Sequence, residues 1–371
     1  MKYYLIAGER SGDLHAANLM RALKLEDPNA EFRFWGGEYM QEVAGQKPVR
    51  HYQDLSFMGF LEVAQNLGTI RRALKQCKAD ILANRPDVVI LVDYAGFNMR
   101  IASFAKEEGI KTFYYISPKI WAWNTGRVHK INKVVDKMFV TLPFEKDFYK
   151  RFGYEVDYVG NPVNDAIAAF TPNPDFRKDN NLGDKQIIAV LPGSRKQEVE
   201  HMLHFMVSII PPYLNDYLFV IAATPNLPAK YYQSFRRHDC IRIVTDQTYD
   251  LLSNARAALV TSGTATLETA LFNIPQVVCY KTSEVSYLIS KAVIKIKWIS
   301  LVNLIANRKV VTELIQSDFN PSNLMKELDK VLFDGPFRDT QLDAYKEIKQ
   351  AIGEAGAGAK AAKLMVNYLK G

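Results

Sequence analysis

Short runs of apolar residues alternate with amphipathic stretches along the first half of the chain. The run Val88–Val92 contains only Val, Ile and Leu, which is typical of a parallel strand buried on both faces. Similar runs predict strands at Tyr3–Ala7, Phe32–Trp35, Thr112–Ile116 and Met138–Thr141. Helical patterns lie between them, including Asp13–Lys24 and most of Gly59–Ala83. Strands that alternate with helices predict βαβ units and a parallel sheet.

The same alternation starts again in the second half of the chain. Its predicted strands are Ile187–Leu191, Leu218–Ala222, Ile241–Val244, Ala257–Val260 and Gln276–Cys279. Residues 160–185 contain three prolines and many polar residues, so we expect a linker there. The predicted fold class is therefore α/β, with two Rossmann-like doubly wound domains and a ligand cleft between them. We expect an N-terminal domain at residues 1–163, a C-terminal domain at 164–340 and C-terminal helices at 341–371.

Composition and charge narrow the range of partners. The formal net charge of +7 favours anionic partners, which are nucleic acid, phosphate-bearing substrates or anionic lipid. The cysteines Cys77, Cys240 and Cys279 are far apart, so neither a disulfide framework nor a zinc site is predicted and a reducing cytosol is the simplest compartment. No run approaches the ~20 apolar residues that a membrane span needs. If this protein contacts a membrane, we expect it to lie on the surface.

Two loops of the second half are candidates for binding a diphosphate. Each follows a predicted strand, precedes a helical stretch and combines Gly with small polar residues, so that helix N–H groups and a positive dipole end face the ligand. Arg195 can add a charge-assisted hydrogen bond of about 1.5–3 kcal/mol. The alternative is that both are ordinary βα turns. The candidate residues are Gly193, Ser194 and Arg195 in the first loop and Ser262, Gly263, Thr264, Ala265 and Thr266 in the second.

Several other nucleotide-binding motifs are missing from the sequence. Neither loop contains the G-K-[ST] of a Walker A motif, and the first turn, Gly8–Gly12, is not G-x-G-x-x-G. The chain has no Asp-x-Asp pair, which a metal-dependent nucleotide-sugar site usually needs. Glu198, His201 and His204 form one helical cluster, but no second set accompanies it. We therefore expect no metal and no cofactor, with the charge of a leaving diphosphate neutralised by helix N-termini and Arg195.

Three carboxylates are candidates for chemistry. Asp93 ends the predicted strand Val88–Val92, and the carboxyl end of a parallel strand points toward the ligand crevice. A general base there contributes about 10²–10⁴-fold in rate, although a turn aspartate is an equal alternative. Asp13 lies at a helix start, where capping is the favoured role. Glu268 lies one turn into its helix and could accept hydrogen bonds from a ribose or be a solvated first-turn residue.

Two segments combine apolar and basic residues. Residues 56–64 have little polarity, and four basic residues follow soon after, which are Arg71, Arg72, Lys75 and Lys78. An apolar segment beside cations suits a membrane interface. The alternative is a core helix with a solvated face. Residues 281–309 hold six basic residues and one acidic residue, interleaved with Ile and Trp. This pattern suits anionic lipid. Nucleic acid is not favoured as a partner, because no nucleic-acid-binding fold signature accompanies the charges.

The chain resembles the lipid-A-disaccharide synthase family along almost its full length. No single block is specific, but many occur in order, which makes chance similarity implausible. The matching blocks are Ala7–Asp13, Phe57–Gly59 with Glu62-Val63, Val92-Asp93 with Phe97-Asn98, Tyr115–Pro118 with Trp121–Trp123, Leu142–Glu145, Val159–Pro162, Leu191–Arg195, Ser262–Glu268, and Ser300-Leu301 with Asn303-Leu304.

The resemblance implies a GT-B fold and an inverting, metal-independent glycosyltransferase. It implies transfer of 2,3-diacylglucosamine from UDP to 2,3-diacylglucosamine 1-phosphate, which forms lipid A disaccharide 1-phosphate and UDP. It also implies a peripheral location at the cytoplasmic face of the inner membrane. The first domain would then face the acceptor and the membrane, and the second would bind the UDP-sugar. Some family members form dimers by exchanging their C-terminal segments, so the resemblance also makes a homodimer possible. Residues 341–371 would then either be exchanged in a dimer or pack back on the N-terminal domain.

The resemblance also assigns roles to individual residues. Asp93 carries over as the base and Arg195 as a residue needed for activity, while Glu268 and Asn303 match positions around the donor. The chain has Gly96 where some members have a second Asp, which leaves any role for a second carboxylate there in doubt. For the acceptor side we expect Glu9, Ser11, Gly12, Asp13, Ser117, Trp121 and Trp123, with Asp13 and Glu9 as alternatives for the base.

Two other functions are compatible with this pattern. A UDP-N-acetylglucosamine 2-epimerase on the same fold would act on a soluble sugar nucleotide and would need no lipid-facing patch. A non-catalytic, membrane-associated nucleotide-sugar binder would bind UDP without turnover.

Overall fold

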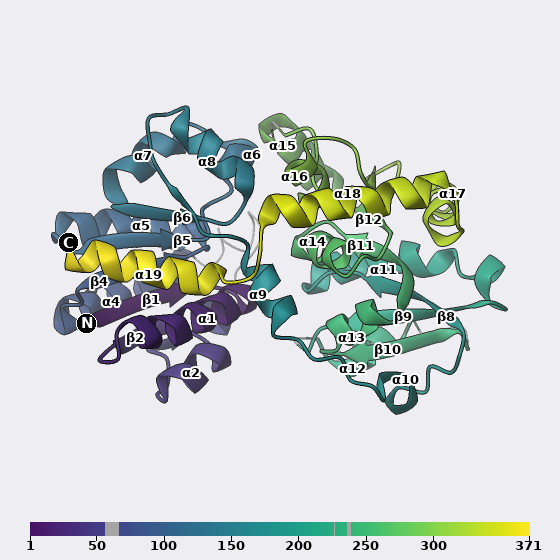
Figure 1. The fold of residues 1–371 in the computed structure, drawn as a ribbon, viewed down its shortest axis with the longest axis horizontal. Coiled ribbons are helices and arrows are strands. Elements are labelled where there is room, and N and C mark those ends of the chain that lie inside the picture. The colour runs from purple at the N-terminus through teal and green to yellow at the C-terminus, as the bar shows by residue number, and fades with distance from the viewer. Residues whose placement is uncertain (56–66, 226, 236–238, 295) are drawn as a thin grey trace. The chain divides into compact units, whose positions relative to one another are not determined.

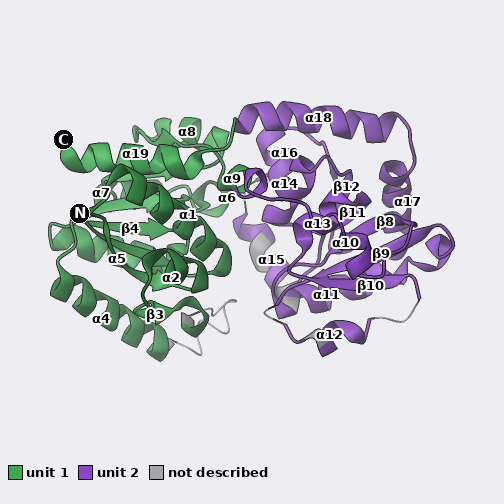
Figure 2. Ribbon diagram, turned by 60° about the horizontal axis from the view of Figure 1, so that its bottom comes forward, with its two compact units in different colours: residues 1–165, 354–371 green, residues 166–353 purple. Residues whose placement is uncertain are grey.

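The computed structural model describes residues 1–55, 67–225, 227–235, 239–294 and 296–371. They form two compact units, which are residues 1–165 with 354–371 (unit 1) and residues 166–353 (unit 2; Figure 2). The boundaries expected from the sequence are 163/164 and 340/341. In the structure the long helix α18 (Pro336–Ile352) belongs to unit 2, and only the last helix, α19 (Ala357–Lys370), belongs to unit 1 (Figure 1).

The described part of unit 1 contains a seven-stranded parallel sheet in the order β3-β2-β1-β4-β5-β6-β7. Its strands are β1 (Lys2–Ala7), β2 (Glu31–Gly36), β3 (Arg50–His51), β4 (Val88–Val92), β5 (Lys111–Tyr115), β6 (Lys137–Val140) and β7 (Asp157–Tyr158). Its helices are α1 (Arg10–Glu26), α2 (Glu38–Ala44), α4 (Leu67–Asn84), α5 (Ala95–Glu107), α6 (Ile120–Trp123), α7 (Arg127–Val134), α8 (Pro143–Lys150), the start of α9 (Pro162–Ala168) and α19, with a 3₁₀ turn at Tyr52–Leu55.

Both faces of this sheet are buried, as the apolar runs predict. Every residue of β4 is inaccessible to solvent. Alternate residues of β1, Tyr3, Leu5 and Ala7, pack in one core with side chains of α1 and α19. A hydrophobic strand buried on both faces is what a doubly wound parallel sheet requires. The C-terminal helix therefore completes the core of the N-terminal unit.

The carboxylate of Asp165 holds the start of α19 in unit 1. Asp165 accepts hydrogen bonds from the backbone N–H groups of Gly356, Ala357 and Gly358, at 2.6, 3.0 and 2.9 Å. These groups begin the helix and have no partner within it. Asp165 thus acts as an N-terminal cap although it lies almost 200 residues earlier in the chain.

The described part of unit 2 contains a six-stranded parallel sheet in the order β10-β9-β8-β11-β12-β13. Its strands are β8 (Gln186–Leu191), β9 (Tyr217–Ala223), β10 (Ile241–Thr245), β11 (Ala255–Thr261), β12 (Gln276–Tyr280) and β13 (Thr312–Ile315). Its helices are the end of α9, α10 (Phe176–Asp179), α11 (Lys196–Ser208), α12 (Ala229–Gln233), α13 (Thr248–Ser253), α14 (Thr264–Leu271), α15 (Glu284–Val293), α16 (Leu301–Ala306), α17 (Pro321–Leu332) and α18, with a 3₁₀ turn at Pro211–Tyr213.

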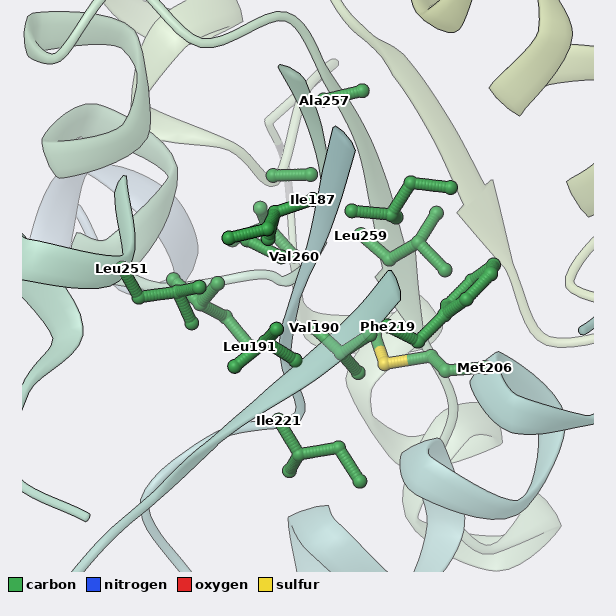
Figure 3. Packing of buried hydrophobic residues seen from close by; sticks show 14 of the residues in the cluster. Ile187, Val190, Leu191, Met206, Phe219, Ile221, Leu251, Ala257, Leu259 and Val260 are labelled. Atoms are coloured by element: carbon green, nitrogen blue, oxygen red, sulfur yellow. The ribbon is translucent and has the colours of Figure 1, made fainter. Parts of the chain in front are cut away.

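The core of unit 2 forms between this sheet and its helices. Figure 3 shows Val190 of β8, Phe219 of β9 and Leu259 of β11, together with Met206 of α11 beside Phe219. All of these side chains are fully buried or nearly so. The tight core holds the strand ends in a fixed register, with Leu191 beside Val260.

The structure confirms the ten predicted strands and adds three. β3 and β7 lie at the two edges of their sheet. Each has only two residues, and a strand of that length is too short to show a hydrophobic pattern. β13 is an edge strand whose residues alternate between buried and half-buried. The expected linker at 160–185 contains α9 and α10, and its beginning belongs to unit 1. Of the predicted helix at Gly59–Ala83, residues 59–66 lie outside the described residues.

Candidate active site

Both sheets have a topological switch point, and several of the candidate residues follow the strands on either side of it. In unit 1 the chain goes from β1 toward β2 and β3, and from β4 toward β5 to β7. In unit 2 it goes from β8 toward β9 and β10, and from β11 toward β12 and β13. The connections diverge at such points, which leaves a crevice at the carboxyl ends of the strands where α/β proteins bind ligands. Each unit therefore has one preferred binding position.

Asp93 lies at the switch point of unit 1 in a constrained backbone conformation. Asp93 and Tyr94 have φ values of 46° and 48°, in the left-handed region that costs non-glycine residues about 1–3 kcal/mol each. The carbonyl oxygen of Asp93 accepts hydrogen bonds from the Tyr114 hydroxyl at 2.5 Å and the Asn98 amide at 2.8 Å. These bonds fix the backbone of Asp93 while its side chain remains half-buried. Such local strain is typical of functional sites.

Gly8 faces this turn from the neighbouring strand. The register pairs Ala7, the last residue of β1, with Val92, the last residue of β4. Gly8 and Asp93 therefore occupy equivalent positions directly after neighbouring strands. A Cβ on Gly8 would lie 2.2 Å from Cγ of Tyr94. Burial raises the pKa of Tyr94 to about 12, and Glu9 adds to the rise. Gly8 is thus required for close packing of the Tyr94 ring.

Asp13 has a different capping role from the one that the sequence suggests. Helix α1 begins earlier, at Arg10, so Asp13 lies within its first turn and is fully buried. Its carboxylate accepts hydrogen bonds from the N–H groups of Gly37, Tyr39 and Met40, at 2.6, 3.0 and 3.3 Å. It therefore caps α2 instead of its own helix. Burial raises the pKa of this carboxyl, and the three amide groups oppose the rise.

The other acceptor-side candidates after β1 lie around the start of α1. Glu9 is the N-cap residue and is half-buried, whereas Ser11 is exposed. Gly12 is buried, and a Cβ placed on it would be in ordinary van der Waals contact with the Cβ of Ala7, at 3.5 Å. The Arg10 guanidinium donates to the Tyr39 hydroxyl at 3.1 Å. Unit 1 thus brings Glu9 and Ser11 to the same end of the sheet as Asp93.

Two acceptor-side candidates after β5, Ser117 and Trp121, bond to a buried carboxylate that was not among the predicted site residues. Glu145 accepts hydrogen bonds from Ser117 Oγ at 2.5 Å and Trp121 Nε1 at 3.0 Å. Burial raises the pKa of Glu145 even though its hydrogen-bond donors favour the ionised form. Trp123 is half-buried, and the Arg127 guanidinium lies 4.2 Å from its ring centroid. A Glu two residues after Pro143 signals a helix start, but nothing in the sequence shows its distant partners.

In unit 2 the first phosphate-loop candidate follows β8. Gly193 has a φ of 107°, and a Cβ on it would lie 2.6 Å from Oε2 of Glu198. Glu198 accepts from Ser194 N at 3.2 Å and from Arg195 Nη1 at 3.0 Å. The Arg195 side chain remains 44% exposed, so it can still contact a ligand. Glu198 therefore orders this loop.

The second phosphate-loop candidate follows β11, the neighbour of β8. Ser262 is held by its N–H, which donates to Cys279 O at 3.2 Å, and by its hydroxyl, which donates to Ile299 O at 3.0 Å. Gly263 and Thr264 are exposed, and Thr264 begins α14 with Ala265 next. Thr266 turns inward, and both its N–H and its hydroxyl donate to Gly263 O. The loop thus presents a helix N-terminus beside Arg195's loop, which suits an anion.

Two further donor-side candidates have internal partners. Glu268 accepts from the Tyr249 hydroxyl at 3.1 Å, and burial raises the pKa of its carboxyl. Asn303 is fully buried. Its Oδ1 accepts from the N–H groups of Val310 and Val311, and its Nδ2 donates to Val311 O and to Glu313 Oε1. The structure therefore shows Asn303 shaping the loop between α16 and β13.

The described residues also show whether other kinds of site are present. No three His, Cys, Asp or Glu side chains within the described ranges gather so that they could hold a metal ion. No helix among those residues combines the length and the apolarity that a membrane crossing requires. The free cysteines Cys77, Cys240 and Cys279 are all buried.

Comparison with solved structures shows the fold. The co-structure of S. aureus MnaA with UDP aligns with a TM-score of 0.69 at 14% identity, covering 100% of this chain and 97% of that one. The Methanocaldococcus jannaschii UDP-GlcNAc 2-epimerase in complex with UDP-GlcNAc and UDP gives 0.66 at 16% identity, covering 100% and 99%. At this identity the likeness shows the fold alone, and the fold is GT-B, as expected from the sequence.

Sequence comparison is more specific. The family model described as lipid-A-disaccharide synthetase matches residues 3–365. The lipid-A-disaccharide synthase of Syntrophus aciditrophicus is 36% identical over 99% of this chain and 97% of its own length. That of Nitrosococcus oceani is also 36% identical, over 99% of this chain and 96% of its own. The chain therefore belongs to the lipid-A-disaccharide synthases, a family of glycosyltransferases.

Proposed function

We propose that this glycosyltransferase moves 2,3-diacylglucosamine from UDP to the 6-hydroxyl of 2,3-diacylglucosamine 1-phosphate. The products are a β-1,6-linked disaccharide 1-phosphate and UDP. Membership of the family supports the joining of two lipid A sugars. The substrates and the inversion at the anomeric carbon are our extension of that assignment.

The observation that carries the mechanism is the placement of Asp93. Hydrogen bonds from Tyr114 and Asn98 hold its backbone at the end of the fully buried strand β4, while Asp93 as a residue is only half-buried. In the proposed step this carboxylate accepts the proton of the acceptor 6-hydroxyl. The oxygen attacks the anomeric carbon as the bond from that carbon to the UDP oxygen breaks. One such displacement inverts the anomeric configuration, and the base contributes about 10²–10⁴-fold in rate.

The leaving diphosphate is assigned to the two loops at the switch point of unit 2. The N-terminus of α14, begun by Thr264, offers backbone N–H groups and a positive dipole end. Arg195, on the loop after the neighbouring strand, adds a guanidinium that is 44% exposed beside its ion pair with Glu198. Donors fixed in place before the bond breaks stabilise the charge that develops on UDP. This arrangement supplies the stabilisation without requiring a metal ion.

We also propose that the protein works on the cytoplasmic face of the inner membrane, where its acylated substrates reside. Leu288, Val293 and Ile294, in α15 and directly after it, are 63%, 41% and 41% exposed. Lys291 and Lys297 are exposed beside them. Apolar residues next to cations favour an anionic lipid surface. The other candidate segment, residues 56–64, lies outside the described residues.

The test is to incubate the purified protein with both acylated substrates and to look for the disaccharide 1-phosphate by mass spectrometry. Release of UDP that requires the acylated acceptor supports transfer. Conversion of UDP-N-acetylglucosamine in the absence of an acceptor would instead identify an epimerase. Binding of UDP without either product would identify a non-catalytic binder.

A further inference from the structure

The mechanism above leaves Glu145 without a role. This residue lies in the first turn of α8, and only 2% of its surface is exposed. We propose that Glu145 is a positioning residue that fixes the segment 117–123 in the form that binds the acceptor. The proposal rests on the proposed function, since it assumes that this segment contacts the acceptor.

The two oxygens of Glu145 have different partners. Oε2 accepts from the N–H groups of Thr141 at 3.1 Å and Leu142 at 2.9 Å, immediately before α8. These bonds satisfy the start of its own helix, as a capping glutamate does. Oε1 takes no part in the cap and accepts instead from Ser117 and Trp121, more than 20 residues earlier. One carboxylate therefore joins the start of α8 to the segment that follows β5.

This segment needs an external support. It begins after Ile116, whose φ of 64° lies in the left-handed region, and the short helix α6 covers only Ile120–Trp123. A helix of one turn is not stable by itself. Trp121 packs edge-on against Phe144 with 5.0 Å between ring centroids, next to its hydrogen bond with Glu145. Phe144 and Glu145 therefore both contact the indole of Trp121.

The anchored residue determines how its neighbour is presented. Trp121 is 9% exposed and points to Glu145, whereas Trp123 is half-buried and stacks with Arg127. Residues two positions apart on a helix do not face the same side. Fixing Trp121 in the interior therefore turns Trp123 to another side of α6, where its ring stacks with Arg127 of α7 (Arg127–Val134).

The burial of a carboxylate here is not explained by stability alone. Burial of a charge is unfavourable unless hydrogen bonds compensate for it. Well-packed apolar residues often replace buried ionic groups without loss of stability. A glutamate that only capped α8 could leave its second oxygen in water. The hydrogen bonds that fix Ser117 and Trp121 instead explain why the carboxylate is buried.

The main test is Glu145→Gln, which keeps the shape but turns one acceptor oxygen into a donor. One of the two pairs of partners then loses its acceptor. We expect KM for the acceptor to rise about 10-fold, which corresponds to the loss of one or two buried hydrogen bonds. KM for the UDP-sugar and kcat at saturating acceptor should stay close to the wild-type values. Ser117→Ala and Trp121→Phe, which each remove one bond, should give smaller rises in the same KM.

The matched control is Tyr154→Phe. Its hydroxyl donates to Val135 O at 3.2 Å, and its ring packs against Tyr149 of α8 at 5.8 Å. This variant also loses a buried hydrogen bond near α8, so it should lower thermal stability without changing KM for the acceptor. An acceptor KM that is unchanged in folded Glu145→Gln and in the Ser117 and Trp121 variants alike, or an equal rise in Tyr154→Phe, would overturn the positioning role. If Glu145→Gln does not fold, the Ser117 and Trp121 variants decide in the same way.

A second readout does not depend on turnover. Glu145→Gln should make tryptophan fluorescence more accessible to acrylamide, and this increase should disappear in a Trp121→Phe background. No increase, or an increase that persists without Trp121, counts against the anchor. If the wild-type protein makes no disaccharide, the proposed function fails, and the quenching experiment alone then decides whether Glu145 fixes the segment.

Discussion

The ring of Tyr94 occupies the space in which residue 8 would carry a side chain. A Cβ on Gly8 would come within 2.2 Å of Tyr94 Cγ and 2.4 Å of Tyr94 Cδ1. Because Tyr94 follows Asp93 directly and both have left-handed backbone conformations, this contact connects the turn after β1 with the position of Asp93. The first glycine of the chain thus supports the candidate catalytic residue.

We expect Gly8→Ala to displace this turn. It should lower transfer activity by about 10-fold or more and cost about 1–3 kcal/mol of stability, as overpacking of a filled site does. UDP binding should be retained, because its candidate loops lie in unit 2. Steady-state kinetics, thermal unfolding and UDP titration measure the three effects.

Two further variants make the Gly8 test specific. Gly68→Ala lies in α4, where a Cβ has open space, and it should leave activity unchanged. In a Tyr94→Ala background the stability cost of Gly8→Ala should fall, because the clashing ring is gone. A cost that is the same in both backgrounds would show that the clash is not the cause.

Asp93→Asn tests the base. The amide cannot accept the proton of the acceptor hydroxyl, so kcat should fall by about 10²–10⁴-fold while the Kd of UDP stays the same. The control is Asp87→Asn, just before the other end of β4, where Asp87 accepts from Lys2 N at 2.7 Å and is exposed. Equal loss of UDP binding and activity in Asp93→Asn would remove the assignment.

Arg195→Ala tests the diphosphate site. Loss of a hydrogen bond to a charged group costs about 1.5–3 kcal/mol, so the Kd of UDP should rise roughly 10- to 150-fold. Lys196→Ala removes a neighbouring cation that pairs with Glu200 at 3.7 Å and is 65% exposed. Calorimetric titration should find almost no change in this control. Similar losses in both variants would indicate a general effect of charge and not a specific contact.

The pH dependence of stability should reveal His15. Burial lowers the pKa of His15 to about 4, and Asp165 opposes the shift. The unfolded chain has a histidine pKa of about 6.5, so between pH 6.5 and 4 the unfolded state binds more protons. Stability therefore falls as the pH is lowered through this window, with His15 contributing up to about 3 kcal/mol.

The measurement is the unfolding temperature of wild type and His15→Leu at several pH values from 7 to 4. On acidification, the unfolding temperature should fall less in His15→Leu than in the wild type. The difference should be several degrees, because a contribution of about 3 kcal/mol shifts the unfolding temperature by that much in a unit of this size. His129→Gln alters an exposed histidine of α7 and should follow the wild type. Parallel curves for wild type and His15→Leu would contradict the prediction.

Asp165→Ala should loosen the C-terminal helix. It removes the acceptor for three N–H groups at the start of α19, and loss of an N-terminal cap costs about 0.5–2 kcal/mol. Hydrogen exchange at Gly356, Ala357 and Gly358 should become faster, and the unfolding temperature should drop. Asp175→Ala changes an exposed N-cap residue of α10 that makes no capping bond, so it should have little effect. Unchanged exchange in Asp165→Ala would exclude the capping role.

The sequence by itself determined the two parallel sheets, because continuous apolar runs such as Val88–Val92 can be stable as strands only when both faces are covered. It also determined which residues follow those strands, including Asp93, Gly193 and Gly263. Short edge strands such as Asp157–Tyr158 gave no signal, since two residues show no period.

Only the tertiary structure decided which distant groups share a hydrogen bond. Asp13 at a helix start predicts capping of that helix, but its carboxylate reaches Gly37 and caps α2. Asp165 caps α19, and Glu145 holds Ser117 and Trp121. Local periodicity reports which face of an element is buried, whereas the partner of a buried polar group depends on packing between elements that are far apart in the chain.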